Sequence, residues 1–156
     1  MKMISMIKLI FPDVFNNQFK GHKIAVYVFY IITAFTLWRS QHHLLAADGG
    51  AQSIATIPLD SFTEAGAQAV VGAFSLWGLS QLFVGVIYLI VSLRYRSMIP
   101  LRYLLMMFEY VVRANYFPIY KQIPTTGTAP GAAGNLPLII ISVVMLFLSI
   151  HSPKKS

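Results

Sequence analysis

The chain has 156 residues, which fits one domain, and only 11% of them are charged, whereas about a quarter of the residues of a soluble domain are charged. With 56% hydrophobic residues and a mean hydropathy of +0.66, its net charge of +7 favours a membrane protein rather than a nucleic-acid partner, because the basic residues lie between apolar stretches. The absence of cysteine excludes disulfides, thiolate chemistry and thiolate-bound metal.

The first segment, residues 1–11, carries apolar residues at helical spacing around Lys2 and Lys8. This pattern favours a helix that lies on the cytoplasmic surface of a membrane. A disordered tail is the alternative.

Four apolar stretches follow, and a membrane-spanning helix needs about 20 such residues. The first is predicted to end before Asp48-Gly49-Gly50, and the second to begin in a capping box at residues 61–64. The first is interpreted as a retained span, because the 23 residues before it are long for the start of a signal peptide. The predicted spans cover residues 24–45, 65–93, 100–120 and 136–150.

The basic residues predict the orientation of these spans. Nine of the twelve flank the spans on one side, while three of the five acidic residues lie on the other side. The link over residues 121–137 is rich in Pro and Gly and is predicted to be an outer loop without regular helix. The sequence therefore predicts one all-α domain over residues 1–156. We expect an integral membrane four-helix bundle with cytoplasmic termini, in a bacterial inner membrane.

The third span carries the strongest indication of a site. Arg102, Met106, Glu109, Arg113 and Phe117 recur at steps of three or four residues and so share one helix face. A charge at this depth costs at least a few kcal/mol, so the face is expected to turn inward. Two interpretations stay open: a polar pocket for a ligand, or an ion pair that holds the bundle in register.

The second span offers a surface expected to face the third. Gly78 and Gly85 permit a close approach of helices, and Gln81 lies between them on the same face. Ordinary small-residue packing, with Gln81 bonded to Glu109, is the alternative to a pocket. The predicted ligand-binding side chains are Glu109, Arg113, Gln81, Tyr110 and Phe117.

Other polar and aromatic residues give weaker indications. His42 and His43 are adjacent and point about 100° apart on a helix, so no metal site is expected, and both are interpreted as interfacial. Tyr103, near a span end, is typical of the aromatic belt. No catalytic motif is present, so no catalytic residue is assigned and an enzyme acting alone is not expected.

The last two spans resemble the DoxX-like group of small four-helix bacterial membrane proteins. The matching features are Leu104-Leu105, Glu109-Tyr110, Arg113, Lys121-x-Ile123-Pro124-Thr125-x-Gly127, Pro130-Gly131 and Gly134-Asn135. The resemblance implies a membrane bundle, which in some members is associated with quinone-linked oxidoreductases. It identifies no cofactor and no catalytic residue.

Two classes of function follow from these observations. The first is an accessory subunit, or a bundle that binds an apolar molecule of the quinone or lipid type, within a larger membrane complex or a homo-oligomer. The second is a small transporter or oligomeric pore lined by the charged face of the third span. A face turned inward within one chain favours the first, and a face covered only by another copy favours the second.

Overall fold

The computed structural model describes residues 2–151, with side chains from Met6 onward, and this part of the chain contains helices and no strand. The helices are α1 (Lys2–Ile10), α2 (Lys23–Leu45), α3 (Glu64–Arg94), α4 (Ile99–Asn115), α5 (Phe117–Tyr120), α6 (Pro130–Ala133) and α7 (Asn135–Ile150). Short 3-10 turns cover Leu59–Ser61 and Arg96–Met98. The all-α prediction is confirmed for the described residues, and α1 matches the helix expected near the N-terminus.

Turn and capping residues set the helix ends, in one case as predicted and in the other two residues later. Helix α2 ends at Leu45, and Gly49 and Gly50 then take φ values of +60° and +72°, a turn that favours glycine. The capping box predicted at residues 61–64 is wrong by two residues. The N-cap is Thr63, whose hydroxyl accepts a hydrogen bond from the Gly66 backbone N–H at 3.2 Å.

The third predicted span is interrupted. Helix α4 ends at Asn115, and α5 begins after Tyr116. Pro118 explains the break, because it lacks the N–H that would have bonded the carbonyl of Ala114. The outer loop predicted over residues 121–137 is also partly wrong. It contains the turn of α6, and α7 begins at Asn135 with Pro137 in its first turn, where proline is tolerated.

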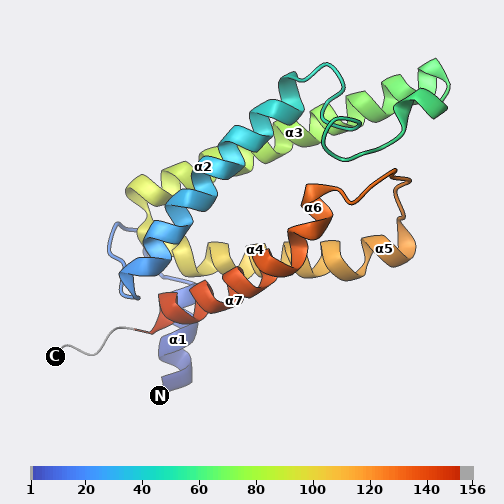
Figure 1. Ribbon diagram of the computed structural model, residues 1–156. Coiled ribbons are helices and arrows are strands. Elements are labelled where there is room, and N and C mark those ends of the chain that lie inside the picture. The colour runs from blue at the N-terminus through green and yellow to red at the C-terminus, as the bar shows by residue number, and fades with distance from the viewer. Residues whose placement is uncertain (1, 152–156) are drawn as a thin grey trace.

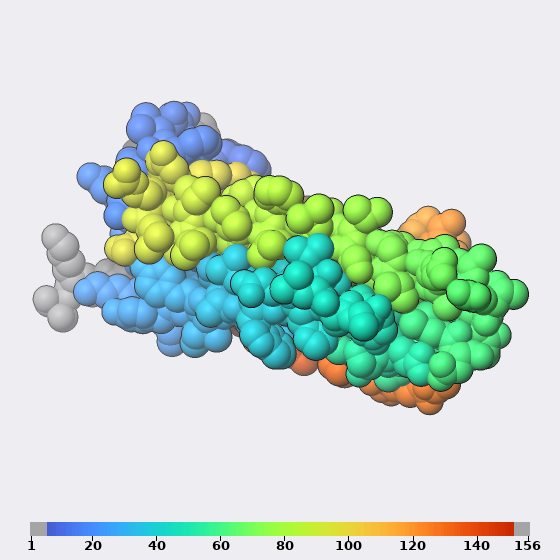
Figure 2. Space-filling view, turned by 90° about the horizontal axis from the view of Figure 1, so that it is seen from above, coloured from blue at the N-terminus to red at the C-terminus, as the bar shows by residue number. Residues whose placement is uncertain are grey.

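The long helices form two antiparallel pairs (Figure 1). Helices α2 and α3 pack side by side along the length of α2 (Figure 2). Helix α4 pairs with α7 instead of α3, and few contacts join α3 to α4. Helix α1, the C-terminal end of α7 and the α3–α4 link lie at one end of the molecule, called here the terminal end (Figure 1). The loops over residues 46–63 and 121–129 lie at the opposite end, called the loop end.

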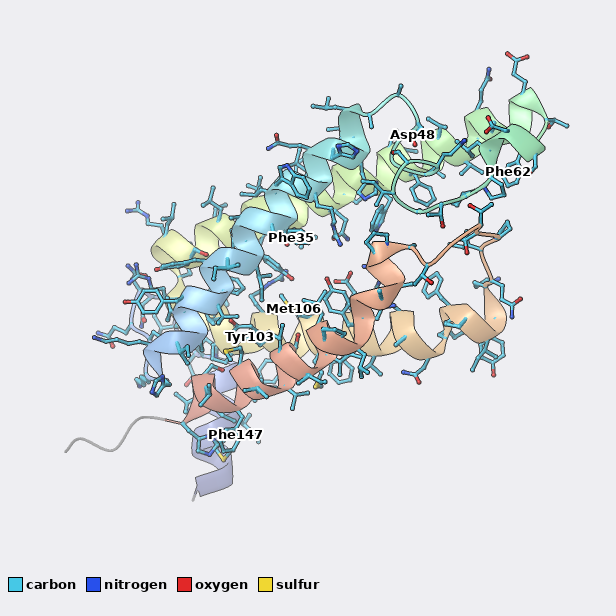
Figure 3. All side chains as sticks on the ribbon, viewed as in Figure 1. Phe35, Asp48, Phe62, Tyr103, Met106 and Phe147 are labelled. Carbon is cyan, nitrogen blue, oxygen red and sulfur yellow. The ribbon has the colours of Figure 1, made fainter. Side chains whose placement is uncertain are left out.

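The main hydrophobic core joins the two pairs near the terminal end. Phe29 of α2 is fully buried, and its ring lies 5.2 Å from that of Tyr88 on α3 and 5.7 Å from that of Tyr103 on α4. The Tyr103 hydroxyl donates a hydrogen bond to the Ala25 carbonyl at 2.7 Å. Tyr103 is therefore a core residue, and the aromatic-belt interpretation is wrong for it. Tyr103 and Met106 lie between the pairs, whereas Phe35 and Phe147 lie on outer surfaces (Figure 3).

Backbone contacts hold the terminal end together. The His22 N–H donates to the Leu148 carbonyl at 2.9 Å, and the Ser97 N–H donates to the Asn16 carbonyl at 3.1 Å. These contacts bring the N-terminal segment, the α3–α4 link and the end of α7 together. Several basic residues belong to the chain segments near this end: Lys8, Lys20, Lys23, Arg94 and Arg96.

Two loops contact each other at the loop end. The Thr126 N–H donates to the Thr56 carbonyl at 2.9 Å, and the Thr56 hydroxyl donates to the Gly127 carbonyl at 3.0 Å. Thr56 has a φ of +57°, which costs a residue other than glycine about 1 kcal/mol or more. The contact therefore joins the α2–α3 pair to the α4–α7 pair, and the residue that makes it, Thr56, has a strained backbone.

Asp48 organises the first of these loops (Figure 3). Its carboxylate accepts hydrogen bonds from the backbone N–H groups of Gly50 at 2.8 Å, Ser53 at 2.7 Å and Gln52 at 3.1 Å. Partial burial alone would raise the pKa of Asp48, but these hydrogen bonds outweigh burial and lower the pKa to about 2.

Two helical stretches of the described chain are long and apolar enough to cross a membrane, Glu64–Arg94 and Pro130–Ile150. Helix α2 carries Arg39 and two histidines, and α4 carries three charged residues within 17 positions. Hydropathy therefore distinguishes α3, and the stretch formed by α6 and α7, from α2 and α4. Each apolar helix is paired with a more polar one.

Candidate functional site

The inner face of α4 carries the ion pair predicted from the sequence. Arg113 Nη1 lies 3.4 Å from Glu109 Oε1, one helical turn apart. Met106 on the same face is buried. The side chains of Arg113 and Glu109 keep 24% and 38% of their surface uncovered. The pair is long for a charge-assisted hydrogen bond, and the chain itself does not enclose it.

A second polar group comes from the α2–α3 pair. Arg39 Nη2 of α2 donates a hydrogen bond to Gln81 Oε1 of α3 at 3.2 Å. The Arg39 guanidinium carbon lies 5.4 Å from the centre of the Trp77 ring, one turn before Gln81. Gln81 is therefore bonded to Arg39, and the expected bond to Glu109 is not formed.

Trp77 connects the two groups. The guanidinium carbon of Arg113 lies 5.8 Å from the same Trp77 ring and 5.4 Å from the Tyr110 ring. Arginines from opposite helix pairs thus meet at one indole, within the range of cation–π attraction. Glu109, Arg113, Tyr110 and Gln81, all predicted from the sequence, take part in this group. We call it the Trp77 cluster: Arg39, Trp77, Gln81, Glu109, Tyr110 and Arg113.

Phe117 is the predicted site residue that the structure separates from this group. It lies on α5, beyond the break caused by Pro118, and is 43% exposed. Its ring packs against its neighbour Tyr116 at 5.8 Å. The helical spacing that grouped Phe117 with Arg113 assumed an unbroken helix.

The two glycines of α3 face α2, and the prediction that they form a wall opposite α4 is wrong. A Cβ atom on Gly78 would lie 2.7 Å from the Leu44 backbone nitrogen, and one on Gly85 would lie 2.9 Å from Leu37 Cδ2. Because both spaces are filled by α2, the glycines serve close helix packing. The small-residue alternative is the correct interpretation for them.

His43 also has a structural role. It is 4% exposed, its ring lies 4.8 Å from that of Trp77, and its Nδ1 lies 2.8 Å from the Gly49 carbonyl oxygen. The interpretation of His43 as an interfacial residue is wrong. The ring supports Trp77 from the α2 side, whereas His42 is exposed.

Arg39 and Trp77 belong to the site but are not among the predicted site residues. The signals were present, since Trp77 and Gln81 are four residues apart on one helix and Arg39 is a charge within an apolar span. Their convergence depends on the α2–α3 pairing, which residue spacing does not predict. Arg102 was placed on the correct face, and its guanidinium carbon lies 4.5 Å from the Tyr88 ring centre.

A cavity of about 260 Å³ lies at the terminal end, away from the Trp77 cluster. Residues of the N-terminal segment, the α3–α4 link, α4 and α7 surround it. Its lining includes Lys8, Asp13, Asn16, Gln18, Ser97 and Ser149. Lys8 and Asp13 form an exposed ion pair at 2.9 Å, which raises the pKa of Lys8.

Comparison with known proteins gives no relative from which a function follows. No protein-family model, no curated protein and no solved structure matches the chain. The resemblance to DoxX-like proteins therefore remains a prediction from the residues alone.

Proposed function

We propose that the chain is a four-span membrane protein with cytoplasmic termini that binds an amphipathic molecule, of the quinone or lipid type, at the Trp77 cluster. It would act as a binding bundle or as an accessory subunit of a larger membrane complex. The observation that carries the proposal is the partly uncovered Glu109–Arg113 pair, which lies beside Arg39 and Trp77 between the two helix pairs.

The physical argument concerns the surface that the chain leaves uncovered. Glu109 and Arg113 keep 38% and 24% of their side-chain surface open within an apolar bundle. In a bilayer this surface would contact hydrocarbon, at a cost of several kcal/mol for a charge, unless a polar group covered it. A bound head group would supply that cover, and its apolar tail would lie against the helices.

The proposed orientation follows from the charges at the two ends. Basic residues gather around the terminal end, and Asp48, Asp60 and Glu64 belong to the loop end. The positive-inside rule puts the basic end in the cytoplasm, which for a bacterium is the inner-membrane orientation. Lys154 and Lys155, which also contribute to this argument, lie outside the described residues. The helix α1 would then rest on the cytoplasmic surface, with exposed Ile7 and Phe11 toward the lipid.

The inward position of the charged face favours a binding bundle over a pore. Arg113 approaches Trp77 of the other helix pair in the same chain, so another copy is not needed to turn this face inward. Ion flux through liposomes that disappears in Glu109→Gln would support the transporter or pore in its place.

Native mass spectrometry of the full chain in mild detergent tests the binding proposal. We expect a bound molecule with the mass of a quinone or lipid, and its loss in the Glu109→Gln/Arg113→Gln double variant. The exposed Lys121→Gln is the matched control and should retain the molecule. Wild-type protein free of any bound amphiphile, under conditions that preserve its fold, would contradict the proposal. The same spectra report copy number and partner chains.

Cysteine labelling tests the orientation, since the chain has no cysteine of its own. Single cysteines at the exposed Ala47 and Thr128 should react with a membrane-impermeant reagent from outside the cell. A cysteine at Ser97 should react only after the membrane is opened. Ser156, also expected on the cytoplasmic side, lies outside the described residues. Labelling of Ala47 from the cytoplasm alone would overturn the four-span topology.

A further inference from the structure

The charges inside the bundle do not balance. Arg39, Arg102 and Arg113 lie on or between the helix pairs, and Glu109 is the carboxylate among them. The chain has five acidic residues, and the other four have different partners near the ends. Asp13 pairs with Lys8, Asp48 accepts from its own loop, Asp60 accepts from Gln52, and Glu64 accepts from Gln68.

Arg39 has hydrogen-bonding capacity that the protein leaves unused. Its Nη2 donates to Gln81, but its Nε is buried and has no hydrogen-bond partner. A guanidinium has five N–H groups in a planar fork that matches the oxygens of a carboxylate or phosphate. Arg102 also has a buried Nε without a partner. Both Nε atoms are covered by protein atoms, so the chain holds these two arginines without their full set of hydrogen bonds.

The contact between Arg113 and the Glu109 carboxylate is weak. The contact to Glu109 is 3.4 Å long, and the other Nη group extends toward α6, where a Cβ on Gly131 would lie 3.5 Å from Nη2. The Trp77 ring holds Arg113 and Arg39 at 5.8 and 5.4 Å from its centre. Two cations drawn to one indole repel each other in a medium of low dielectric constant, and an anion between them removes that repulsion.

We propose that the ligand carries an oxyanion head, a phosphate or carboxylate, on an apolar tail, and that Arg39 and Arg113 hold the head beside Trp77. This inference rests on the proposed binding function and names its substrate class. Glu109 competes with the ligand for Arg113 and limits the affinity. Gln81 orients Arg39 through its Oε1, and the tail follows the apolar surface between the helices into the bilayer.

Tryptophan fluorescence of the detergent-solubilised full chain provides the test. The chain has two tryptophans, and Trp38 is 65% exposed, so Trp38→Phe leaves Trp77 as the reporter at the site. The titrants are short-chain phosphatidic acid, a short-chain fatty acid, uncharged diacylglycerol with the same tails, inorganic phosphate and a short-chain quinone. We expect saturable changes with phosphatidic acid or the fatty acid, and binding of diacylglycerol at least about tenfold weaker.

Variants on this background test the roles of the charged groups. Arg39→Gln and Arg113→Gln should each weaken anion binding by about tenfold or more. Glu109→Gln should tighten it several-fold, because the competing carboxylate is gone, and a misfolded protein would not give this gain. Arg94→Gln, at the exposed end of α3, is the matched control and should bind as before.

The arms of the titration separate the outcomes. If inorganic phosphate saturates the site with the same affinity as phosphatidic acid, the apolar tail does not contribute to binding. That result would overturn the proposal of an oxyanion head on an apolar tail. Equal binding of diacylglycerol and phosphatidic acid, or binding of the quinone alone, would overturn the oxyanion assignment and leave the proposed binding function standing. The absence of saturable binding by every amphiphile, with the fold intact, would contradict both proposals.

Discussion

The terminal end and the loop end join the same two helix pairs by different contacts. At the terminal end, Phe29 packs on Tyr88 and Tyr103 in a fully buried aromatic group, and a buried hydrogen bond runs from Tyr103 to Ala25. Toward the loop end, the pairs meet through Arg113 over Trp77 and through the loop contact of Thr56 with Thr126. The first set of contacts is buried, whereas the second leaves charged groups partly open.

This difference suggests that the terminal end provides the stability of the fold and the Trp77 cluster provides the ligand-binding groups. Apolar close packing is strong and has little capacity to rearrange, because a core has few voids. Guanidinium groups held over aromatic rings are individually weaker and can exchange partners. We expect substitutions at the terminal end to affect unfolding most, and substitutions in the Trp77 cluster to affect ligand binding most. Four predictions test this comparison.

The largest effect is expected for Phe29→Ala. The substitution opens a cavity among Tyr88, Tyr103 and the fully buried Ile99, and should lower the free energy of unfolding by about 3–5 kcal/mol. Phe35→Ala is the matched control on the same helix. Phe35 is 52% exposed, so its loss should cost about 1 kcal/mol or less. Denaturation in detergent measures both, and equal losses would contradict the location of the core.

Gly78→Ala is expected to have the next largest effect. The added methyl group would lie 2.7 Å from backbone of α2, so the helices must separate, at a cost of about 1–3 kcal/mol. Gly72→Ala is the control, because a Cβ there meets nothing within 4 Å. It should stabilise α3 by up to about 1 kcal/mol, since alanine favours helix. Thermal melts of the two variants that shift in the same direction would argue against the α2–α3 packing.

The Glu109–Arg113 ion pair is expected to give a smaller and non-additive effect. Arg113→Ala strands Glu109 and should destabilise by about 1–2 kcal/mol, less than for a fully buried pair because both side chains are partly open. The double variant Glu109→Gln/Arg113→Gln strands no charge and should be more stable than Arg113→Ala. Melting temperatures in detergent decide between them. If Arg113→Ala leaves the melting temperature unchanged, water solvates the Glu109 carboxylate in the absence of Arg113.

The smallest effect concerns the loop end and depends on pH. The pKa of Asp48, about 2, lies below the ordinary value of 3.8, so its carboxylate stabilises the fold above about pH 4. That contribution is lost as the pH falls toward 2. The stability difference between the protein and Asp48→Asn should therefore shrink by roughly 1 kcal/mol from pH 5 to pH 2. Chemical denaturation across this range measures it, and a constant difference would show that Asp48 does not hold the loop through its charge.

Parts of the candidate site were predictable because they lie on one helix. The spacing of Glu109, Tyr110 and Arg113 predicts a local pair and a neighbouring ring, and the structure contains both. Spacing alone groups Phe117 with them, but Pro118 lacks the N–H that would bond the carbonyl of Ala114. Proline at that position is a sequence signal, and it would have ended the helix at the observed place.

Contacts between helices were not predictable in the same way. Spacing gives the face on which Gly78 and Gln81 lie, but not the helix that the face meets. The structure pairs that face with α2, so Gln81 bonds Arg39, and Trp77 receives arginines from both pairs. The fully buried ring of Tyr103 was assigned to the membrane surface for the same reason, because its position near a span end carries no information about its neighbours.

The sequence by itself determined the helical class, the approximate ends of the four long helices and the charge difference between the two ends of the bundle. These properties depend on local hydrophobic runs, turn residues and caps, which act over a few residues. Only the tertiary structure decided that α2 pairs with α3, that α4 pairs with α7, and that Arg39 and Arg113 converge on Trp77. Pairing depends on how whole surfaces fit, and small residues such as Gly78 select a partner by the shape of the facing helix, which lies far away in the sequence.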